Sequence, residues 1–443
     1  MIKRAALKEV LKQYRITHWV QDDRTYRQVS ISQTGEVTFR GEKSGREIGR
    51  KRQFVVDLDK HPNTLIFIRQ GISKGGIGIA PAEVNKCLVT ENMPMFDIVG
   101  IKPGYLSLYL KSPQFKNDIN RLVPLGTAQK AIHEKHLLQL EMLLPPEEVQ
   151  DEVIHKITSI MKNEERLSLR TVRSIKLIAS LRQAILQEAV SGKLVPQDPK
   201  DESASELLRK IKAEKEKLID EKRISKEKEL PPISKKEIPY ELPGGWEWTK
   251  LGEICCGITS GSTPSKDQFC TKGGIPYLKV YNIVNNKIDF SVKSQYIAET
   301  VHRTKNKRSI LYPNDVIMNI VGPPLGKIAI IPSNYPEWNC NQAIVFFRPF
   351  IKELSNWIYT FLCEGSFLDS IELIGTAGQD NISVTKSKNI LIPIAPLSEQ
   401  KFIVQKVDQL MILCNELEQK IRENQKNSEF LMEAVLKEAF EFS

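Results

Sequence analysis

The feature that most constrains this chain is a long internal repeat. Residues 146 to 190 align without a gap on residues 396 to 440, at a constant offset of 250 residues. The identical pairs include Pro146/Pro396, Gln150/Gln400, Lys156/Lys406, Met161/Met411, Leu167/Leu417, Leu181/Leu431, Ala184/Ala434, Leu186/Leu436, Glu188/Glu438 and Ala189/Ala439. Both copies keep the same length from an initial proline to a terminal Glu-Ala pair. We therefore expect two rod-like segments whose length is important to the structure.

Both copies are predicted to be helical. Apolar residues recur at alternating steps of three and four, and glycine and internal proline are absent. The first seam is Val153, Ile157, Ile160, Glu164, Leu167, Thr171, Ser174, Ile178, Leu181 and Ile185; the second is Ile403, Val407, Leu410, Cys414, Leu417, Ile421, Asn424, Ser428, Leu431 and Val435. Apolar ends and a polar middle favour a coiled-coil pair. The alternative is two ordinary core helices, although ~45 residues is several times the mean helix length.

The segments before the two helices also repeat, but less closely. Residues 65 to 81 and 316 to 332 each show an apolar run, a glycine turn and a second apolar run, which indicates strand, loop and strand. Short helical stretches with Phe115 and Ile119, or Phe367 and Ile371, also correspond. The predicted fold is therefore α/β (α+β), with two globules of mixed strands and short helices separated by two long antiparallel coiled-coil-like helices.

These patterns divide the chain into five segments. We expect a first globule over 1–145, a long helix over 146–192, a charged linker over 193–240, a second globule over 241–395 and a second long helix over 396–443. Within the linker, residues 203 to 229 can form a solvated helix with a thin apolar stripe, made of Leu207, Leu208, Ile211, Leu218 and Ile219. The linker is then either a tether that positions the second globule or a disordered segment.

Composition narrows the class of protein. The 64 lysines and arginines outnumber the 54 aspartates and glutamates, which favours a polyanionic partner such as nucleic acid. The seven cysteines lack the paired spacings of a zinc site or a disulfide scaffold, so we expect reduced thiols in the cytoplasm. The N-terminus is charged throughout, and no stretch reaches the ~18 to 20 apolar residues of a membrane span. Secretion and membrane insertion are therefore not expected.

Several motifs together carry a family resemblance. They are ILQEAVSGKLVPQDPKDESASELLRKIKAEKEKLI from Ile185, ELPGGWEWTKLGEI from Glu241, IPYLKVYNI from Ile275, GTAGQDNIS from Gly375 and PLSEQKFIVQKVDQL from Pro396. With them the chain resembles the DNA-specificity subunit of type I restriction-modification enzymes.

The resemblance implies a non-catalytic subunit that recognises double-stranded DNA. Each globule would be a target-recognition domain for one part of a split, asymmetric DNA sequence. The two helices would form a spacer that docks two methyltransferase subunits, in a complex that also contains restriction subunits. S-adenosylmethionine, ATP and magnesium would bind those partner subunits, and none would bind this chain.

The first globule departs from the family pattern. It lacks the tryptophan-containing opening that ends in Leu251-Gly252-Glu253, and it is predicted to begin with a basic helical stretch. Its long helix also begins with Val149-Gln150 where the second has Glu399-Gln400.

No constellation of catalytic residues is found. The turn from Gly322 to Ile328 is one residue short of a phosphate-binding loop and lacks its magnesium-binding hydroxyl. The Asn/Asp-Pro-Pro-aromatic motif of an amino-methyltransferase is also absent. Among six histidines only His133 and His136 have a ligand spacing, and Glu134 and Lys135 around them indicate a solvated surface instead of a metal site.

Basic residues cluster at equivalent places in the two globules, just before an apolar strand. The first cluster is Arg40, Lys43, Arg46, Arg50, Lys51 and Arg52; the second is Arg303, Lys305, Lys307 and Arg308. One charge run alone is usually a solvated face. Two at equivalent places favour contacts with DNA phosphates, which supply most non-specific affinity and fix the register of the protein.

Reading a base sequence requires side chains that match base edges, such as arginine for guanine and asparagine or glutamine for adenine. Candidates in loops are Gln70, Lys74, Gln129 and Lys130 in the first globule, and Ser260, Ser262, Thr263, Tyr277, Lys279, Tyr281, Asn282, Lys327, Gln379 and Asn381 in the second. The alternative is that these residues only make turns, and tyrosines are more often core than reader.

Two other classes of function remain open from the sequence. One is an enzyme fragment or fused nuclease with unrecognised chemistry, and the other is a coiled-coil scaffold whose globules bind protein. Neighbouring genes for a methyltransferase and an ATP-driven nuclease would favour DNA recognition, and their absence would favour the scaffold.

Overall fold

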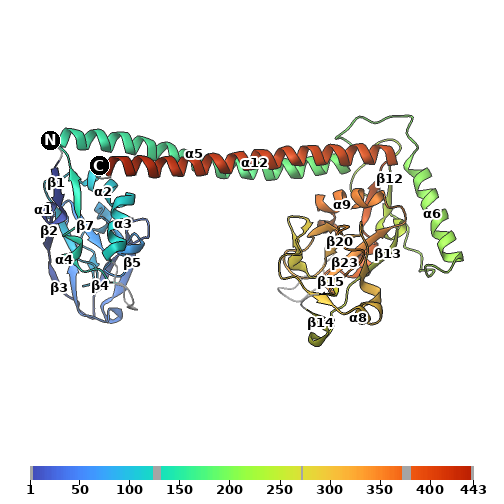
Figure 1. The fold of residues 1–443 in the computed structure, drawn as a ribbon, viewed down its shortest axis with the longest axis horizontal. Helices are drawn as coiled ribbons and strands as arrows, with labels where there is room; N and C mark the ends of the chain where they lie inside the picture. Colours follow the sequence, from blue (N-terminus) through green and yellow to red (C-terminus); the bar gives the residue numbers. More distant parts are fainter. Residues whose placement is uncertain (1–2, 123–130, 271–272, 372–380, 441–443) are drawn as a thin grey trace. The chain divides into compact units, whose positions relative to one another are not determined.

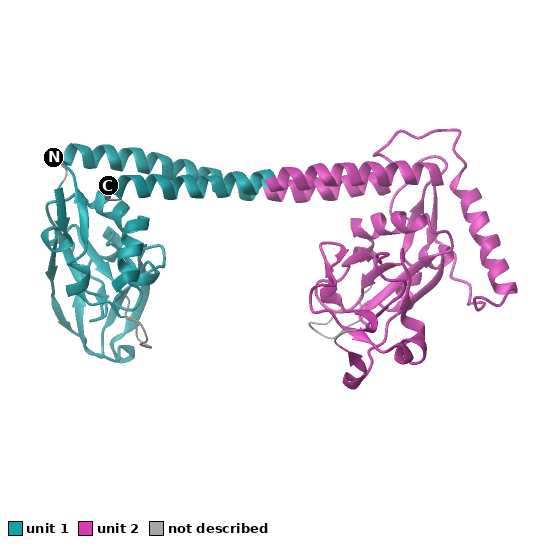
Figure 2. Ribbon diagram, viewed as in Figure 1, with its two compact units in different colours: residues 1–174, 420–443 teal, residues 175–419 magenta. Residues whose placement is uncertain are grey.

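The computed structural model describes residues 3–122, 131–270, 273–371 and 381–440, and Figure 1 shows its elements. The chain divides into two compact units, residues 1–174 with 420–443 and residues 175–419 (Figure 2). Each unit holds one globule together with part of each long helix. No helix in the described ranges is long and apolar enough to cross a membrane.

Unit 1 contains two sheets and a strand pair. The four-stranded antiparallel sheet is β2 (Leu11–Tyr14), β10 (Met95–Ile98), β7 (Thr64–Phe67) and β8 (Ile77–Ile79), and the five-stranded sheet is β3 (Thr17–Trp19), β6 (Arg52–Val55), β9 (Leu88–Val89), β4 (Thr25–Ile31) and β5 (Val37–Ser44). β1 (Lys3–Ala6) pairs with β11 (Glu141–Leu144). The short helices are α1 (Leu7–Val10), α2 (Pro103–Lys111), α3 (Pro113–Leu122) and α4 (Glu134–Leu137), with 3-10 turns at Gly45–Glu47, Ile72–Lys74 and Ala82–Val84.

Unit 2 is built in the same way. Its four-stranded sheet is β13 (Cys255–Ser260), β23 (Ile344–Pro349), β20 (Val316–Asn319) and β21 (Ile328–Ile330), and its five-stranded sheet is β14 (Phe269–Cys270), β18 (Tyr296–Ile297), β15 (Ile275–Leu278), β22 (Trp338–Cys340) and β19 (Ile310–Leu311). The strand pairs are β12 (Glu247–Lys250) with β24 (Leu391–Ile394) and β16 (Ile283–Val284) with β17 (Lys287–Ile288). The short helices are α7 (Leu251–Ile254), α8 (Glu299–Arg303), α9 (Leu354–Glu364), α10 (Phe367–Ser370) and α11 (Val384–Lys388), with 3-10 turns at Lys266–Gln268, Val280–Asn282 and Lys307–Ser309.

The two globules share one topology despite their different sequences. The order β2-β10-β7-β8 in unit 1 corresponds to β13-β23-β20-β21 in unit 2. In the second sheets, β6-β9-β4-β5 corresponds to β19-β22-β15-β18, and the parallel pair falls at the same place, β4 with β9 and β15 with β22. The internal repeat therefore extends from the helices to both globules, and the predicted α/β (α+β) class with two long helices is confirmed.

The predicted opening of the first globule is wrong. A basic helical stretch is not formed; the chain makes strand β1, the single turn α1 and strand β2, as β12, α7 and β13 do in unit 2. The amide of Leu7 donates to Leu140 O at 2.8 Å, and that of Leu251 donates to Ile390 O at 3.0 Å. Buried leucines at these two positions fix the turn, so Leu7 to Val10 replaces the Leu-Gly-Glu motif of unit 2.

The long helices are α5 (Glu147–Val190) and α12 (Leu397–Phe440), each of 44 residues. Each unit contains the start of one and the end of the other, so the two run antiparallel. Both begin with the same side-chain cap. Gln150 Nε2 donates to Pro145 O at 2.9 Å, and Gln400 Nε2 donates to Ala395 O at 2.8 Å, which explains why the repeat keeps this glutamine.

Most of the predicted seam is buried or half-buried, with exceptions on both helices. Leu181, Leu417, Asn424 and Leu431 are exposed. At the end of α12 the buried residues are Met432, Leu436 and Phe440 instead. The Phe440 ring packs against Tyr105 and Tyr109 of α2, with centroids 5.1 and 5.8 Å apart. This end of α12 therefore turns its apolar side to the globule as well as to α5.

The linker packs against unit 2. Its helix, α6 (Ala204–Asp220), is shorter than predicted, and Leu207 and Ile211 are its buried stripe residues. Lys215 Nζ lies 2.9 Å from Glu253 Oε2, and Lys250 Nζ donates to Pro231 O at 2.7 Å. These contacts order the segment on the surface of the second globule, which argues against the disordered alternative.

Candidate nucleic-acid interface

The two basic clusters occupy the same place in the shared topology. Cluster 1, residues 40–52, lies on and between β5 and β6; cluster 2, residues 303–308, lies between β18 and β19. Since β5 corresponds to β18 and β6 to β19, the clusters are topological equivalents. Both clusters consist mainly of exposed side chains.

Cluster 1 contains both engaged and free cations. Arg50 pairs with Glu91, and Lys51 pairs with Asp22 and donates to Gly45 O. The others are exposed and form no ion pair within the described ranges: Arg40, Lys43, Arg46 and Arg52. The Arg52 guanidinium lies over the Phe54 ring, 5.6 Å from its centroid. This contact positions the charge without neutralising it.

Cluster 2 shows the same division. Arg303 bridges two carboxylates, Glu299 at 3.2 Å and Glu337 at 2.6 Å, and its hydrogen bonds lower the pKa of Glu337. Lys305, Lys307 and Arg308 are exposed and have no ion pair in the part of unit 2 that the structure describes. Arg303 therefore has a structural role, whereas the other three cations are available to a phosphate.

A buried polar network anchors cluster 2. Asn339 Nδ2 donates to His302 Nδ1 at 3.0 Å, and His302 Nε2 lies 3.1 Å from Glu337 Oε2. Because an amide nitrogen only donates, Nδ1 is the acceptor and Nε2 carries the hydrogen that faces Glu337. His302 is fully buried, and burial lowers its pKa against the opposing effect of Glu337. The imidazole is thereby held in its neutral form.

The same network reaches the loop after β13. Asn306 Nδ2 donates to Ser262 O at 2.7 Å and lies 3.3 Å from Asn339 Oδ1, and the hydroxyls of Ser262 and Ser309 are 3.2 Å apart. Cluster 2 and the loop containing Ser260, Ser262 and Thr263 are thus fixed relative to each other. Thr263 is the exposed one of these three, and Ser260 and Ser262 are half-buried.

Two predicted base readers are corrected. Tyr277 and Asn282 are fully buried. The Tyr277 hydroxyl donates to Ser262 O at 2.9 Å, and Asn282 accepts from Lys279 N and donates to Val292 O at 2.8 Å. Both side chains therefore build the loops from inside and are unavailable to a base.

Their neighbours in the same loop remain at the surface. Lys279 Nζ lies over the Phe269 ring at 5.2 Å, and the half-buried Tyr281 hydroxyl donates to Lys293 O at 3.4 Å. These two side chains are accessible in part, although each already has an internal contact.

In each globule, the residue that precedes the glycine turn, Arg69 in unit 1 and Ile320 in unit 2, contacts a described residue that comes just after a predicted reading loop. In unit 2, Asn319 shapes the turn: its Nδ2 donates to Pro324 O at 2.8 Å and its Oδ1 accepts from Lys327 N at 2.6 Å. Lys327 is half-buried at the end of the turn, and Asn381 forms a bridge with Val321 at its start.

Unit 1 repeats this arrangement. Ile132 N donates to Arg69 O at 2.9 Å, as Ile382 N donates to Ile320 O at 3.0 Å. Gln70 and Lys74 are exposed in the turn that follows Arg69. In both globules, the residue just before the glycine turn, Arg69 or Ile320, therefore accepts a backbone hydrogen bond from Ile132 or Ile382. Gln129, Lys130 and Gln379 lie outside the described residues.

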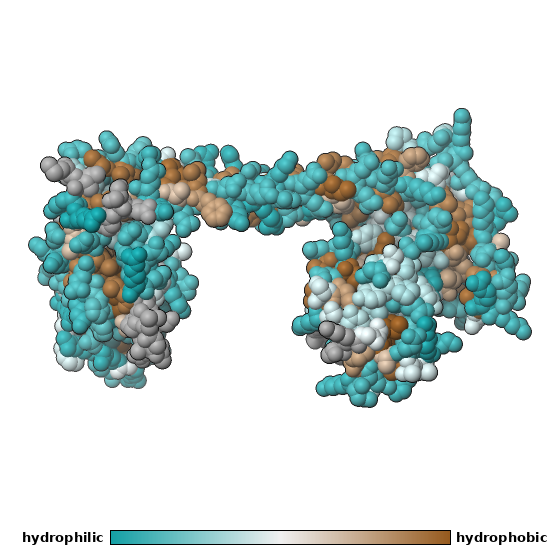
Figure 3. All heavy atoms as spheres, viewed as in Figure 1, coloured by the Kyte–Doolittle hydropathy of each residue, from teal (hydrophilic) through white to brown (hydrophobic). Residues whose placement is uncertain are grey.

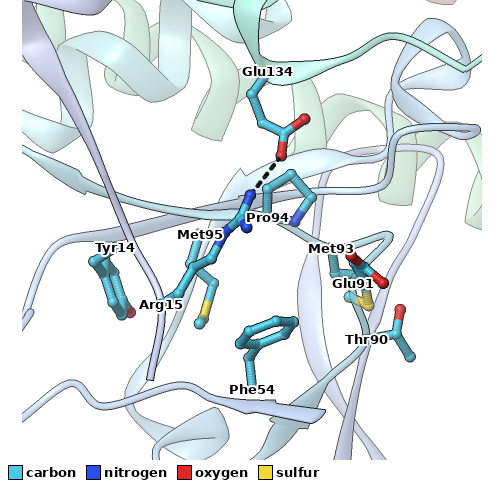
Figure 4. A pocket seen from close by; sticks show the side chains of 9 residues that line it. All are labelled: Tyr14, Arg15, Phe54, Thr90, Glu91, Met93, Pro94, Met95 and Glu134. Atoms are coloured by element: carbon cyan, nitrogen blue, oxygen red, sulfur yellow. Dashed lines mark hydrogen bonds and ion pairs between the residues drawn. The ribbon is translucent and has the colours of Figure 1, made fainter. Parts of the chain in front are cut away.

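Glu134 is not on a solvated surface as predicted. It is buried and accepts from Arg69 Nε at 3.0 Å and from Gln13 Nε2 at 3.2 Å. Burial is the largest single effect and raises the pKa of Glu134, but the hydrogen bonds from Arg69, Gln13 and the backbone, together with the charge of Arg69, outweigh it and lower this pKa. Arg15 also points at this carboxylate across a small pocket (Figure 4). The charged residues that line the pocket are already in ion pairs, Arg15 with Glu134 and Glu91 with Arg50, so the pocket offers no free charge to a ligand.

Two features were not predicted from the sequence. The first is the network of His302, Asn306 and Asn339, whose only signal was a histidine and an asparagine among the lysines of cluster 2. The second is Trp19, which is 67% exposed on an edge strand. In the described ranges, no group of three or more His, Cys, Asp or Glu is placed to hold a metal ion.

A family model described as the type I restriction modification DNA specificity domain matches residues 243–425, which include the whole second globule and most of α12. The EcoAI specificity subunit of Escherichia coli is 28% identical over 407 residues, which cover 82% of this chain and 67% of that protein. The chain is therefore similar to type I specificity subunits over most of its length, and its second half matches their DNA specificity domain. A second Escherichia coli relative, the EcoEI specificity subunit, is 24% identical and covers 84% of this chain and 69% of its own length.

Two solved structures share the fold. A chain from a study of assembly and conformational transition in a type I restriction-modification system superposes with a TM-score of 0.72, at 17% identity, over 99% of this chain and 97% of that one. The HsdS subunit of Thermoanaerobacter tengcongensis gives a TM-score of 0.60 at 18% identity, over 99% and 96% of the two chains. The two relatives are named specificity subunits, which agrees with the family resemblance of the sequence.

Proposed function

We propose that this chain is a specificity subunit that recognises a bipartite, asymmetric sequence in double-stranded DNA, one half with each globule. The observation that carries the proposal is the equivalence of the basic clusters, which lie between corresponding strands of two globules with one topology. A shared fold supplies two similar footprints on the DNA backbone, and different loop residues supply two different half-sites.

Base reading is assigned to exposed or half-buried residues in loops of the two globules. They are Gln70 and Lys74 of unit 1 and Ser260, Ser262, Thr263, Lys279, Tyr281, Lys327 and Asn381 of unit 2. Gln129, Lys130 and Gln379, which lie outside the described residues, are kept as candidates from the sequence alone. Phosphate contacts are assigned to the unpaired cations Arg40, Lys43, Arg46, Arg52, Lys305, Lys307 and Arg308.

The DNA target is tested by methylome sequencing of a host with and without this chain. We expect a split, asymmetric motif with a fixed gap to disappear when the chain is deleted. Replacing the first globule by that of another specificity subunit should change one half of the motif only. A continuous or palindromic motif would contradict two independent readers.

The long helices are proposed to dock two methyltransferase subunits, with restriction subunits joining the complex. Hydrophobic side chains reach the surface along both helices (Figure 3). Leu181 and Leu431 are matched by the repeat, yet both are exposed, as are Ala184 and Ala434. Packing within the chain does not require the same residue at exposed positions of the two repeats. Binding of two copies of one partner, one to each helix, would require it. S-adenosylmethionine, ATP and magnesium are then ligands of the partner subunits.

Docking is tested with one charged substitution on each helix. Leu181→Asp or Leu431→Asp should each release one methyltransferase subunit, and the double variant should release both, as measured by native mass spectrometry of the purified complex. Leu177→Asp is the matched control, because Leu177 is 60% exposed on α5 but its repeat partner is Asn427. Retention of both subunits by the double variant would place the docking surface elsewhere.

A further inference from the structure

Strand β3 has no counterpart in the described part of the second globule. It pairs with β6 on the outer edge of the five-stranded sheet, whereas the described part of unit 2 contains no strand beyond the equivalent β19. The register places Trp19 opposite Arg52, the last residue of cluster 1. Directly opposed residues of an antiparallel pair project from the same face, so the indole and the guanidinium share one surface.

Trp19 differs from the other four tryptophans of the chain. Trp246, Trp338 and Trp357 are buried, and Trp248 is half-buried with its Nε1 donating to Tyr240 O at 3.3 Å. Trp19 is 67% exposed, and its indole N–H makes no hydrogen bond within the described ranges. A large ring with a free donor, held on an ordered strand, has both an apolar face and a polar edge to offer a partner.

The neighbouring charges indicate what that partner is. Arg52 is exposed, has no carboxylate partner among the described residues and is held over the Phe54 ring. Arg46 of the same cluster is also without an ion pair there. A guanidinium that is positioned but not neutralised suits a phosphate, and an adjacent indole suits the apolar sugar or base surface beside it.

We propose that Trp19 and Arg52 form a contact with the DNA backbone that is specific to the first globule. Arg52 binds a phosphate, and the Trp19 ring packs on the adjacent deoxyribose and base edge with its N–H toward a phosphate oxygen. The inference rests on the proposed function, and it extends the footprint of the first globule to an edge strand that is absent from the described residues of the second globule. The two half-sites would accordingly have footprints of unequal length.

The two residues have different signatures in DNA binding by the full chain. Trp19→Ala should weaken binding roughly 5- to 100-fold, the range of one aromatic stacking contact. The loss should be equal for target and non-target duplexes, and the slope of log affinity against log salt should not change, because no charge is removed. Arg52→Ala should lower the magnitude of that slope by about 0.9. Trp19→Phe should retain more affinity than Trp19→Ala.

Phe430→Ala is the matched control. Phe430 is 57% exposed on α12 and has Lys426 5.5 Å from its ring, so it is also an exposed aromatic beside a cation. It lies outside the sheet, and its removal should leave DNA affinity unchanged. All three substituted side chains are exposed, so unchanged thermal unfolding temperatures will show that the variants are folded.

Fluorescence gives an independent readout. Acrylamide should quench Trp19 more than the four other indoles, and duplex DNA should protect it; the quenchable fraction should be missing in Trp19→Phe. Two results together would overturn this inference while leaving the proposed function intact: Trp19→Ala binds DNA with wild-type affinity, and DNA does not protect Trp19 of the wild-type chain from acrylamide. Loss of binding to the target sequence only would show that Trp19 reads a base and does not hold the backbone. If the chain binds no duplex under any condition, the proposed function itself fails.

Discussion

Arg182 of α5 donates to Glu418 of α12 at 2.8 Å, and its second guanidinium nitrogen donates to Asn415 at 2.8 Å. Both charged side chains are about three-quarters buried. A guanidinium that spans two residues one turn apart on the facing helix fixes the register of the antiparallel pair in unit 2. The rod is therefore aligned by a polar contact as well as by its apolar seam.

Reversing one of these charges should destabilise unit 2. For Arg182→Glu we expect a loss of about 1 to 2 kcal/mol in the free energy of unfolding, because it removes a partly buried pair and adds a repulsion. The exchange Arg182→Glu with Glu418→Arg should recover most of it. Urea unfolding of the two singles and the double measures this coupling. Lys176→Glu, at an exposed site of the same helix without an ion pair among the described residues, is the control.

The cations of cluster 2 should divide into two kinds. Changing Lys305, Lys307 and Arg308 to alanine should weaken binding to all duplexes and lower the salt slope by up to ~2.7, at ~0.9 for each phosphate contact. Arg303→Ala should instead lower stability, because it leaves Glu337 without its strongest partner, and should change the slope little. Titrations of DNA binding at several salt concentrations test this. An unchanged slope in the triple variant would mean that the cluster faces solvent in the complex.

His302 should make unit 2 sensitive to mild acid. Its pKa is lowered in the folded state by burial, so the unfolded state takes up a proton first as the pH falls. Stability is then complete above about pH 6.5, the ordinary histidine pKa, and is lost below it. Protonation at Nδ1 would also remove the acceptor for Asn339 and loosen the link between cluster 2 and the loop at Ser262.

This dependence can be isolated because His302 is the one histidine between residues 175 and 419. Chemical unfolding at pH 7.5 and 5.5 should show a larger loss for the wild type than for His302→Gln. Burial raises the pKa values of Asp315 and Glu399, so these two groups make the folded state more stable as the pH falls. Both are present in the wild type and in His302→Gln, so their effect cancels in the comparison. Equal losses in the two proteins would show that His302 is not the source.

The parts of this architecture that could be predicted are those with a period or a repeat. The helices followed from spacing, and their limits were predicted closely because proline precedes each one. The opening of the first globule was not predicted, because the segment around Leu7 to Val10 has a helical pattern locally. Only the pairing of β1 with β11 and the hydrogen bond from Leu7 N to Leu140 O limit it to a single turn. Tyr277 and Asn282 were misassigned for a similar reason, since burial depends on contacts distant in sequence.

The seam shows the same limit within a helix. A heptad pattern identifies Leu431 as well as it identifies Ile157, but one is 60% exposed and the other is buried. The heptad pattern considers only the contact between α5 and α12. It does not show that the end of α12 also packs against α2 of the first globule.

Trp19 could not be ranked above other aromatics in the sequence, because only the register of β3 against β6 places it beside Arg52.

Helix length should set the gap between the two half-sites of the proposed target. Each helix of 44 residues is roughly 66 Å long at ~1.5 Å per residue. Inserting seven residues after Leu167 and seven after Leu417 keeps the heptad phase and lengthens both helices by about 10.5 Å, or about three base pairs at ~3.4 Å.

The preferred gap should then grow by about three base pairs while both half-site sequences stay the same, because the reading loops are untouched. Affinity should fall, since three base pairs also rotate the second half-site by roughly 100° and the DNA must twist or bend to compensate. Selection from random duplexes measures gap and half-sites together. A single insertion after Leu167 is the control, because it mismatches the two helices and should lower stability without defining a new gap. Altered half-sites at the original gap would mean that the helices do not act as the ruler.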